Sequence, residues 1–374
     1  MKKCEVSKYC GGCIYQGIDY KKQLQTKQEK INKLLSKFRD VKPIIGMGNP
    51  YNYRNKVQVS FGYDDYHHVI VGNYVTSTHY IVPIEDCNIC DEKANEIINS
   101  IKRLVIKYKI NIFDERVLKG TMRHILIRCS NTGEYMVVLV TGSLTIRNGD
   151  AFIKDIIKYN PCVTTIIQNI NNRHTSMVLG ERNTVLYGKG YITDELCGLK
   201  FQISANSFYQ VNKTQTEVLY KQVINAAEKD DLLIDAYCGT GTIGLIMANS
   251  VKHVIGVEIN RNAVKDAIKN AKNNNIKNAE FICEDASNFM TNYKGKVDIL
   301  VMDPPRSGAD DRFLKATLKL SPKKIVYVSC NPLTLKENLV FLSKYYNIKS
   351  IQPVDMFPFT EHVETVVLMS RVDK

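Results

Sequence analysis

The sequence predicts an α/β protein with a doubly wound sheet, a strand-rich central region and a cysteine-rich N-terminal segment. From residue 204 onward, short apolar runs alternate with amphipathic stretches, which is typical of parallel strands joined by helices. Between residues 43 and 203, short apolar runs are instead separated by turn residues, which favours a strand-rich unit. Three cysteines fall within the first 13 residues. We therefore predict domains at residues 1–42, 43–203 and 204–374.

Hydrophobic periodicity places the elements within these regions. Leu24, Ile31, Leu34 and Leu35 recur at helical spacing, so residues 17–38 predict an amphipathic helix. The central region predicts a helix at Asp91–Lys109 and strands at Lys56–Tyr63, His68–Val71, His124–Cys129, Tyr135–Val140, Thr164–Asn169 and Ser176–Leu179. The last region predicts strands at Leu232–Tyr237, Val254–Glu258, Glu280–Cys283, Ile299–Met302, Lys324–Ser329 and Thr365–Ser370, and helices at Thr214–Ala227, Thr242–Asn249, Arg261–Asn274 and Leu333–Leu342.

Composition narrows the class of protein. Lysine and arginine total 51 against 38 acidic residues, a formal net charge of +13, which fits either a polyanionic partner or a solvated basic surface. Met1–Gly12 lacks the apolar core of a signal peptide, and no run of about 18 apolar residues could span a membrane. The 11 cysteines are an odd number, so we expect a cytoplasmic protein whose thiols serve thiolate chemistry, metal ligation or core packing.

A glycine-rich turn, Asp235–Gly244, lies between a predicted strand and a predicted helix. Glycines let the backbone turn sharply and approach a ligand, and a helix N-terminus favours a polar or anionic group. The spacing suits a nicotinamide or flavin dinucleotide, S-adenosylmethionine, or a turn without a ligand. Glu258 ends the next strand, where an acidic residue accepts hydrogen bonds from ribose hydroxyls. Asp285 follows the strand after that, within reach of an adenine.

Two later strands end in residues that can carry chemistry. Ile299–Met302 leads into Asp303-Pro304-Pro305, and the prolines stop the strand and leave Asp303 at the carboxyl edge of the sheet. Lys324–Ser329 leads into Cys330, which we expect at the same edge. A lone cysteine is more often a buried structural thiol. At this edge it can instead add to carbon 6 of a uracil, which makes carbon 5 nucleophilic toward an electrophilic methyl group.

That chemistry sets two requirements. The thiol must be partly exposed, with a pKa below the ~8.5 of free cysteine. A base must then remove the proton from carbon 5. The segment Asp355–Thr365 offers Glu361, His362 and Glu364, and the residues alone leave the role of base open among the three.

In combination, these motifs resemble those of the RNA uracil-5-methyltransferase family, which includes 23S ribosomal RNA enzymes and the tRNA enzyme that makes ribothymidine. The resemblance implies a Rossmann-like S-adenosylmethionine-dependent methyltransferase domain. It implies that Gln210, Tyr237, Glu258 and Asp303 bind the cofactor, with Asp285 as a further adenine contact. It also implies that Cys330 is the nucleophile and Glu364 the proton acceptor. The matching segments are Ser207–Asn212, Tyr237–Gly241, Asp303–Arg306, Ser329–Pro332 and His362–Glu364.

The N-terminal cysteines resemble one branch of that family. Cys4, Cys10 and Cys13, with the distant Cys87, resemble the [4Fe–4S] site of the ribosomal RNA enzymes, and Cys90 competes for the fourth place. Taken by itself, the spacing would equally suit zinc. The tRNA enzyme lacks these cysteines, so the resemblance favours 23S rRNA as the RNA partner and 5-methyluridine as the product. We expect no association with a membrane and no obligatory protein partner. A tRNA substrate and non-catalytic RNA binding are the alternatives.

Many members of the family begin with a small β-barrel RNA-binding domain, and because Cys4 is almost the first residue of the sequence, we expect this domain to be absent. We therefore expect residues 43–203 to contact RNA, although each candidate is individually more often an ordinary strand-face residue. The candidates are Arg54, Lys56, Arg116, Lys119, Arg123 and Arg128 for phosphates, and Tyr51, Tyr53 and Phe61 for stacking on bases.

Two neighbouring enzyme classes fit less well. Radical S-adenosylmethionine enzymes usually space the first two cysteines of their loop by three residues, whereas five residues separate Cys4 from Cys10. RNA cytosine-5-methyltransferases usually carry a cysteine after the proline of the Asp303 motif, where this chain has Pro305 and Arg306.

Overall fold

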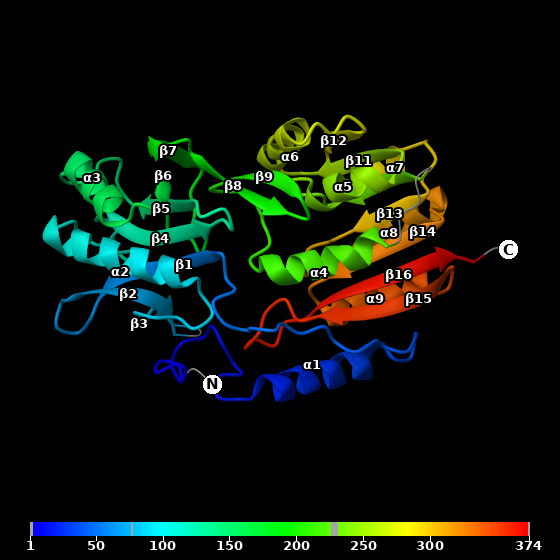
Figure 1. Cartoon of the computed structure of the whole chain (residues 1–374), viewed down its shortest axis with the longest axis horizontal. Coiled ribbons are helices and arrows are strands. Elements are labelled where there is room, and N and C mark those ends of the chain that lie inside the picture. Colours follow the sequence, from blue (N-terminus) through cyan, green and yellow to red (C-terminus); the bar gives the residue numbers. More distant parts are fainter. Residues whose placement is uncertain (1–2, 76–77, 226–230, 373–374) are drawn as a thin grey trace. The chain divides into compact units, whose positions relative to one another are not determined.

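The computed structural model describes residues 3–75, 78–225 and 231–372, which divide into two units. One unit contains residues 1–17, 50–195 and 202–206, and the other contains residues 18–49, 196–201 and 207–374. Figure 1 shows each unit built around its own sheet. Two of the points at which the chain passes between the units lie within a hairpin of β8 (Tyr191–Leu196) and β9 (Leu199–Ser204). Its two-residue turn, Cys197-Gly198, has positive φ at both positions, as the twist of a tight hairpin requires.

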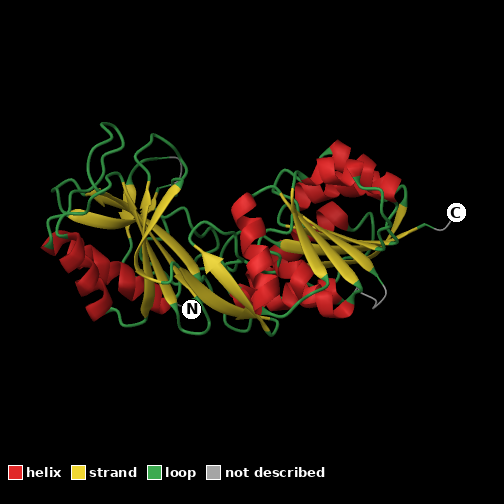
Figure 2. Cartoon of the chain, turned by 90° about the horizontal axis from the view of Figure 1, so that it is seen from above, coloured by secondary structure: helices red, strands yellow, loops and turns green. Residues whose placement is uncertain are grey.

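The first unit holds a mixed sheet with the strand order β3-β2-β1-β4-β5-β6-β7. Its pairs are antiparallel except for β5 and β6, which are parallel and joined through helix α3. Helix α2 packs on β2 and β4 and beside α3, and Figure 2 shows both helices on one side of the sheet. The elements are β1 Lys56–Tyr63, β2 Val69–Tyr74, β3 Ile81–Pro83, α2 Glu92–Lys107, β4 Met122–Cys129, β5 Tyr135–Thr141, α3 Gly149–Tyr159, β6 Val163–Ile170 and β7 Arg182–Gly188.

The second unit holds a doubly wound sheet with the order β12-β11-β10-β13-β14-β16-β15. The strands from β12 to β14 are parallel, whereas β16 runs antiparallel to both β14 and β15. The strands are β10 Leu232–Ala236, β11 His253–Glu258, β12 Ala279–Cys283, β13 Ile299–Met302, β14 Lys324–Ser329, β15 Tyr346–Val354 and β16 Glu364–Arg371.

Helices cover this sheet on both faces. One core cluster joins the sheet to α1, α7, α8 and α9 through buried side chains such as Ile31, Phe289, Phe313 and Leu339. Helices α4, α5 and α6 pack against one another in sequence and against the strands. The helices are α1 Tyr20–Leu35, α4 Lys213–Ile224, α5 Thr242–Met247, the short 3₁₀ turn η1 Ala248–Ser250, α6 Arg261–Asn273, α7 Ala286–Asn292, α8 Asp311–Leu320 and α9 Pro332–Leu342.

The predicted α/β fold class is confirmed, with differences in single elements. The predicted strand Ser176–Leu179 is wrong, because that segment is a loop. Its carbonyls at Met177 and Val178 accept hydrogen bonds from the Asn171 side chain (2.7 and 3.0 Å) instead of from a neighbouring strand. The end predicted for one helix, at Ala227, lies outside the described residues. Elements that the sequence analysis missed are α3, α7, α8, β3, β7, β8, β9 and β15.

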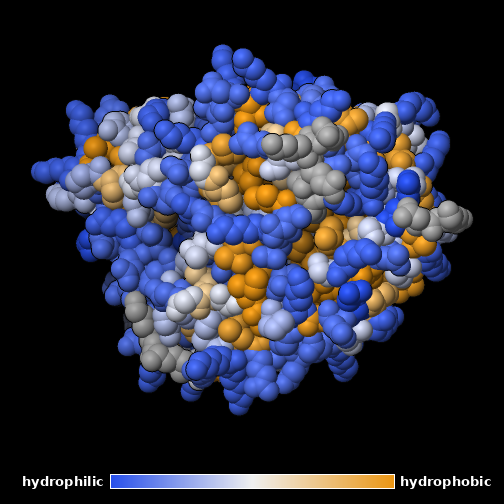
Figure 3. Space-filling view, turned by 45° about the vertical axis from the view of Figure 1, so that its right-hand side comes forward, coloured by the Kyte–Doolittle hydropathy of each residue, from blue (hydrophilic) through white to orange (hydrophobic). Residues whose placement is uncertain are grey.

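The surface is mainly hydrophilic, with hydrophobic residues reaching it in patches on the face seen in Figure 3. In the parts of the chain that the structure describes, no helix combines the length and apolar character needed to cross a membrane.

Candidate active site

One edge of the doubly wound sheet collects the predicted site residues in strand order. Parallel strands end at the same edge, so the residues that follow β12, β11, β10, β13 and β14 lie along it. Since β16 runs in the opposite direction, its first residue lies at the same edge. The series is Asp285 after β12, Glu258 at the end of β11, Tyr237 after β10, Asp303 after β13, Cys330 after β14 and Glu364 at the start of β16.

The glycine turn after β10 has a constrained backbone. Tyr237 (φ 64°), Gly239 (φ 55°) and Gly241 (φ 78°) all lie in the left-handed region, which is uncommon for a residue other than glycine. The ring of Tyr237 packs against Phe313, with 5.3 Å between centroids. A Cβ added at Gly239 would meet no atom within 4 Å, so the turn leaves open space above its backbone.

Two carboxylates brace this turn. Asp235 Oδ2 accepts a hydrogen bond from the Gly244 amide (2.8 Å), and burial raises the pKa of Asp235 to about 7. Glu258 Oε2 accepts from the Gly239 amide (3.1 Å), and its Oε1 accepts from the Asn260 amide (2.7 Å). Glu258 therefore fixes the turn through one oxygen and the loop after β11 through the other, and each oxygen keeps a lone pair for a ligand hydroxyl.

One oxygen of Asp285, Oδ1, accepts two hydrogen bonds within the protein. Its side chain caps helix α7 by accepting from the Asn288 amide (2.9 Å), and it also accepts from the guanidinium of Arg312 (3.0 Å). Gln210 lies in the segment Ser207–Asn212 that precedes α4, where Asn212 caps the helix by accepting from the Gln215 amide (3.2 Å).

Three titratable groups interact at the centre of the edge. Glu364 is buried, and burial together with the nearby charge of Asp303 raises the pKa of the Glu364 carboxyl. Burial also raises the pKa of Asp303. Burial, followed by the charges of Glu364 and Asp303, raises the pKa of the Cys330 thiol to about 11. The guanidinium of Arg306 acts in the opposite direction on both Cys330 and Glu364.

These values correct one expectation. Cys330 is half-buried, so it meets the requirement for a partly exposed thiol. The pKa of the free chain's thiol lies above that of ordinary cysteine, whereas the sequence analysis required it to lie below. The physical cause is a partly desolvated position beside two carboxyl groups, which disfavours the negative thiolate.

Arg306 is a functional candidate to which the sequence analysis gave no role. Its carbonyl accepts hydrogen bonds from Asn331 Nδ2 (2.9 Å) and Thr334 Oγ1 (3.2 Å), which tie the Asp303 motif to the start of α9. Its guanidinium lies 3.4 Å from His362 Nε2. The sequence contains a signal for a functional role of Arg306, because this cationic residue directly follows the Asp-Pro-Pro motif.

The predicted cluster ligands gather in the first unit. Cys4, Cys10, Cys13 and Cys87 line one cavity of about 230 Å³, together with Cys90. Burial raises the pKa of the Cys4 thiol, and Cys87 and Cys10 raise it further. Four thiols facing one cavity are the donor set of an iron–sulfur cluster. Across residues 3–75, 78–225 and 231–372, however, no three His, Cys, Asp or Glu side chains are placed closely enough to hold a metal ion.

The RNA-contact candidates of the central region fall into two groups. Arg123, Arg128 and Phe61 are buried, so the expectation that they contact RNA is wrong for these three. Arg123 donates to Glu115 (2.7 Å) and to the carbonyls of Asn171 and Arg173, and Arg128 donates to the carbonyl of Ala205 (3.2 Å). The remaining candidates are exposed or half-buried: Tyr51, Tyr53, Arg54, Lys56, Arg116 and Lys119.

A doubly wound sheet with a glycine turn after β10 and acidic residues along one edge is typical of folds that bind nucleotide-containing cofactors, which include S-adenosylmethionine-dependent methyltransferases. A model of the tRNA (uracil-5-)-methyltransferase family matches residues 164–372. The chain belongs to this family of RNA methyltransferases.

Relatives and solved structures agree with this assignment. An RNA methyltransferase of Staphylococcus epidermidis is 40% identical over 98% of this chain and 82% of its own length. One of Bacillus cereus is 42% identical over 100% of this chain and 83% of its own length. The crystal structure of Pyrococcus abyssi tRNA (uracil-54, C5)-methyltransferase in complex with S-adenosyl-L-homocysteine is similar with a TM-score of 0.82 and 27% identity, covering 96% of this chain and 86% of that one.

Proposed function

We propose that this enzyme methylates carbon 5 of a uridine in 23S rRNA, using S-adenosylmethionine and a transient covalent bond to Cys330. The observation that carries the proposal is the shared sheet edge, where the glycine turn, Asp303, Cys330 and Glu364 follow one another in strand order. A nucleophile and a proton acceptor beside a cofactor turn are the parts that this reaction needs.

The proposed reaction begins with a covalent bond between the protein and the RNA. The Cys330 thiol first loses its proton to solvent. The thiolate sulfur then bonds to carbon 6 of the uracil, and the electron pair of the C5=C6 double bond moves into an enolate. S-adenosylmethionine supplies an electrophilic methyl group, which carbon 5 accepts while the sulfonium sulfur takes the electron pair of the bond that breaks. Glu364 then removes the proton from carbon 5, the C5–H pair re-forms the double bond, and Cys330 leaves as a thiolate.

The raised pKa values mean that the Cys330 thiol must lose a proton before it can attack. In the free chain, burial raises the pKa of both the Cys330 thiol and the Glu364 carboxyl, and nearby carboxyl charges raise them further. The charge of Arg306 favours both the thiolate of Cys330 and the carboxylate of Glu364, which are the forms that the proposed reaction uses. A uracil in a helical stem must be flipped out before it can reach this edge.

For the cofactor, we propose the residues that the family resemblance implied. Glu258 would accept hydrogen bonds from the ribose, and Asp285 would contact the adenine. The amino acid end and the sulfonium group of S-adenosylmethionine would be bound by Gln210, Tyr237 and Asp303. The open space above Gly239 supports a close approach of the ligand to the turn.

For the substrate, the cysteine set favours ribosomal RNA over tRNA. We propose that Cys4, Cys10, Cys13 and Cys87 hold a [4Fe–4S] cluster, in keeping with their common cavity. The methyl transfer needs no electron, so the cluster would be structural. The second candidate substrate is tRNA, because the fold is similar to that of a tRNA (uracil-54, C5)-methyltransferase. RNA contacts would come from Tyr51, Tyr53, Arg54, Lys56, Arg116 and Lys119.

Mass mapping of RNA from a strain lacking this protein tests the proposal. We expect one or more 23S rRNA fragments to lose about 14 mass units, since a hydrogen replaces a methyl group on the ring. The wild-type gene should restore the mass, and a gene encoding Cys330→Ala should not. Loss of the increment from tRNA would select the second candidate substrate, and unchanged rRNA and tRNA would refute the methyltransferase proposal.

A further inference from the structure

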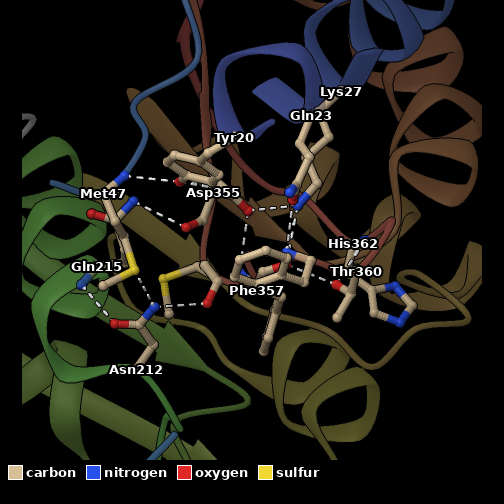
Figure 4. Close-up of polar contacts among 12 residues, drawn as sticks. Tyr20, Gln23, Lys27, Met47, Asn212, Gln215, Asp355, Phe357, Thr360 and His362 are labelled. Atoms are coloured by element: carbon tan, nitrogen blue, oxygen red, sulfur yellow. Dashed lines mark hydrogen bonds and ion pairs between the residues drawn. The ribbon is translucent and has the colours of Figure 1, made fainter. Parts of the chain in front are cut away.

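The turn that precedes Glu364 is held by an unusual set of buried polar side chains. This turn, Asp355–Thr360, links the end of β15 to the segment that leads into β16. Figure 4 shows it surrounded by side chains from α1 and from the start of α4, with dashed lines marking the polar contacts. All of these residues belong to the second unit.

An ion pair with no exposed side-chain surface lies at the centre of this set. Lys27 Nζ donates to Asp355 Oδ1 at 2.6 Å, and both side chains are fully buried. The same ammonium donates to the carbonyl of Phe357 (3.0 Å). The hydroxyl of Tyr20 donates to Asp355 Oδ2 (2.8 Å) and accepts from the Met47 amide (2.9 Å). Lys27 thus binds both the side chain and the backbone of the turn.

Gln23 holds the other end of the turn. Its Oε1 accepts a hydrogen bond from the Phe359 amide (2.9 Å), and its Nε2 donates to the carbonyl of Ile18 (2.8 Å). Phe359 is buried and has a φ of 67°, a conformation that a side chain other than glycine rarely adopts. Such a conformation persists only where the surroundings enforce it, and Gln23 supplies one of the enforcing contacts.

The start of α4 holds the turn from the cofactor side. Asn212 Nδ2 donates to the carbonyl of Met356 (2.9 Å), and Gln215 Nε2 donates to the carbonyl of Asp355 (3.0 Å). Asn212 lies two residues after Gln210, the proposed cofactor residue. The turn is therefore tied to α1 and to the segment that would contact the cofactor.

A buried ionic network of this kind contributes little to the free energy of folding. Burying two charges costs much of what their attraction returns, and apolar side chains of the same size often serve stability as well or better. A buried, fully hydrogen-bonded network does fix one arrangement of the backbone. The feature that it fixes here is the backbone that leads into Glu364, the proposed proton acceptor.

We infer that Tyr20, Gln23 and Lys27 of α1 are positioning residues, which hold the Asp355–Thr360 turn so that Glu364 lies correctly beside Cys330. The inference rests on the proposed function of Glu364. It assigns to α1 a role in one step of the reaction. Formation of the Cys330–RNA bond and methyl transfer do not use Glu364, whereas removal of the carbon 5 proton and release of the RNA do.

The test separates these steps in single-turnover reactions of the full-length protein. The variants are Gln23→Leu, which removes the contact to Phe359, and Lys27→Met/Asp355→Asn, which removes the ion pair without leaving a buried charge. The control is Lys33→Met, the loss of an exposed lysine on the same helix. Each protein receives a 23S rRNA transcript with S-adenosylmethionine, and denaturing gels follow the covalent adduct over time.

A second transcript, made with 5-fluorouridine, isolates bond formation. Fluorine at carbon 5 cannot leave as a proton, so the adduct accumulates whether or not the base is in place. We expect both α1 variants to form the fluorinated adduct no more slowly than the wild type. On the ordinary transcript we expect them to release the RNA roughly 10- to 100-fold more slowly, because a small misplacement of a catalytic group has effects of this size.

Each other outcome counts against the inference. Release at the wild-type rate by both variants would overturn it. Equal slowing of bond formation and release would also overturn it, since that result describes general loss of structure. If the wild-type protein forms no Cys330-dependent adduct with the fluorinated transcript, or with a fluorinated tRNA transcript run in parallel, the proposed function fails first and the inference fails with it.

Discussion

Cys330 and Glu364 lie at the same end of two adjacent antiparallel strands, directly beyond the paired residues Ser329 and Thr365. Neighbouring strands are ~4.8 Å apart, so this register brings the thiol and the carboxyl within reach of one substrate ring. After burial, the charge of Glu364 is the largest influence that raises the pKa of the Cys330 thiol.

Cys330→Ala should abolish methylation and adduct formation and leave S-adenosylmethionine binding unchanged, because the thiol is proposed to bond to the uracil and not to contact the cofactor. Methyl incorporation from labelled cofactor and calorimetric titration measure the two properties. Cys283→Ala is the matched control, since Cys283 is an exposed thiol at the end of β12 on the same sheet. Residual turnover in the Cys330 variant would contradict the proposed nucleophile.

Glu364→Gln should form the covalent RNA adduct and release it very slowly. An amide cannot accept the carbon 5 proton, and general-base contributions are typically 10²- to 10⁴-fold in rate. Denaturing gels with labelled RNA measure the adduct. Glu361→Gln removes an exposed carboxylate that pairs with Lys30 and should resolve its adduct normally. Normal release by the Glu364 variant would remove this residue from the base role.

Alkylation of Cys330 in the free protein should increase with pH up to about 11, because only the thiolate reacts and burial together with Glu364 raises the pKa of the thiol to about 11. Glu364→Gln should shift the profile to lower pH, since it removes one of the negative charges that disfavour the thiolate. Mass spectrometry of the Cys330 peptide after brief iodoacetamide treatment follows the profile. Identical profiles for the two proteins would show that the carboxyl does not act on the thiol.

Gly239→Ala should weaken S-adenosylmethionine binding about tenfold, which corresponds to ~1.4 kcal/mol. The added methyl group would enter the open space above the turn. Gly198→Ala is a matched control, because Gly198 also has a positive φ (78°) with nothing within 4 Å of the added carbon, and it lies in the β8–β9 turn. Each variant should lose roughly 1–2 kcal/mol of stability from backbone strain. An equal loss of affinity in both would indicate a general effect.

Cys10→Ser should remove the visible absorbance and most of the iron and sulfide from anaerobically purified protein. Cys10 is one of the four thiols proposed to hold the cluster and lines their common cavity. Cys162→Ser, which changes a half-buried cysteine that does not line the cavity, should leave the spectrum intact. Wild-type protein with zinc instead of iron, or with neither metal, would refute the cluster proposal.

The parts of the fold that the sequence predicted best are those with continuous apolar runs. Strands β10, β11, β13 and β14 are of this kind, because a central parallel strand is covered on both faces. β15 was missed since Lys349 and Pro353 interrupt its pattern. A strand at the edge of a sheet tolerates both, and Pro353 pairs there with Thr365.

The site was predictable for a related reason. Once strands end in Tyr237, Glu258, Asp303 and Cys330, topology alone brings those residues to one edge. Burial of single polar residues was not predictable. Lys27 looks like a solvated lysine of an amphipathic helix, and its partner Asp355 is 328 positions away. Arg123 and Arg128 similarly look like phosphate ligands until their buried carbonyl partners are known.

The reversed direction of β16 has a consequence for protein synthesis. The ribosome completes the glycine turn and Cys330, the proposed nucleophile, more than 30 residues before it adds Glu364. β16 lies between β14 and β15, and both of these strands precede it in the chain. A nascent chain therefore contains the proposed nucleophile before it contains the proposed proton acceptor.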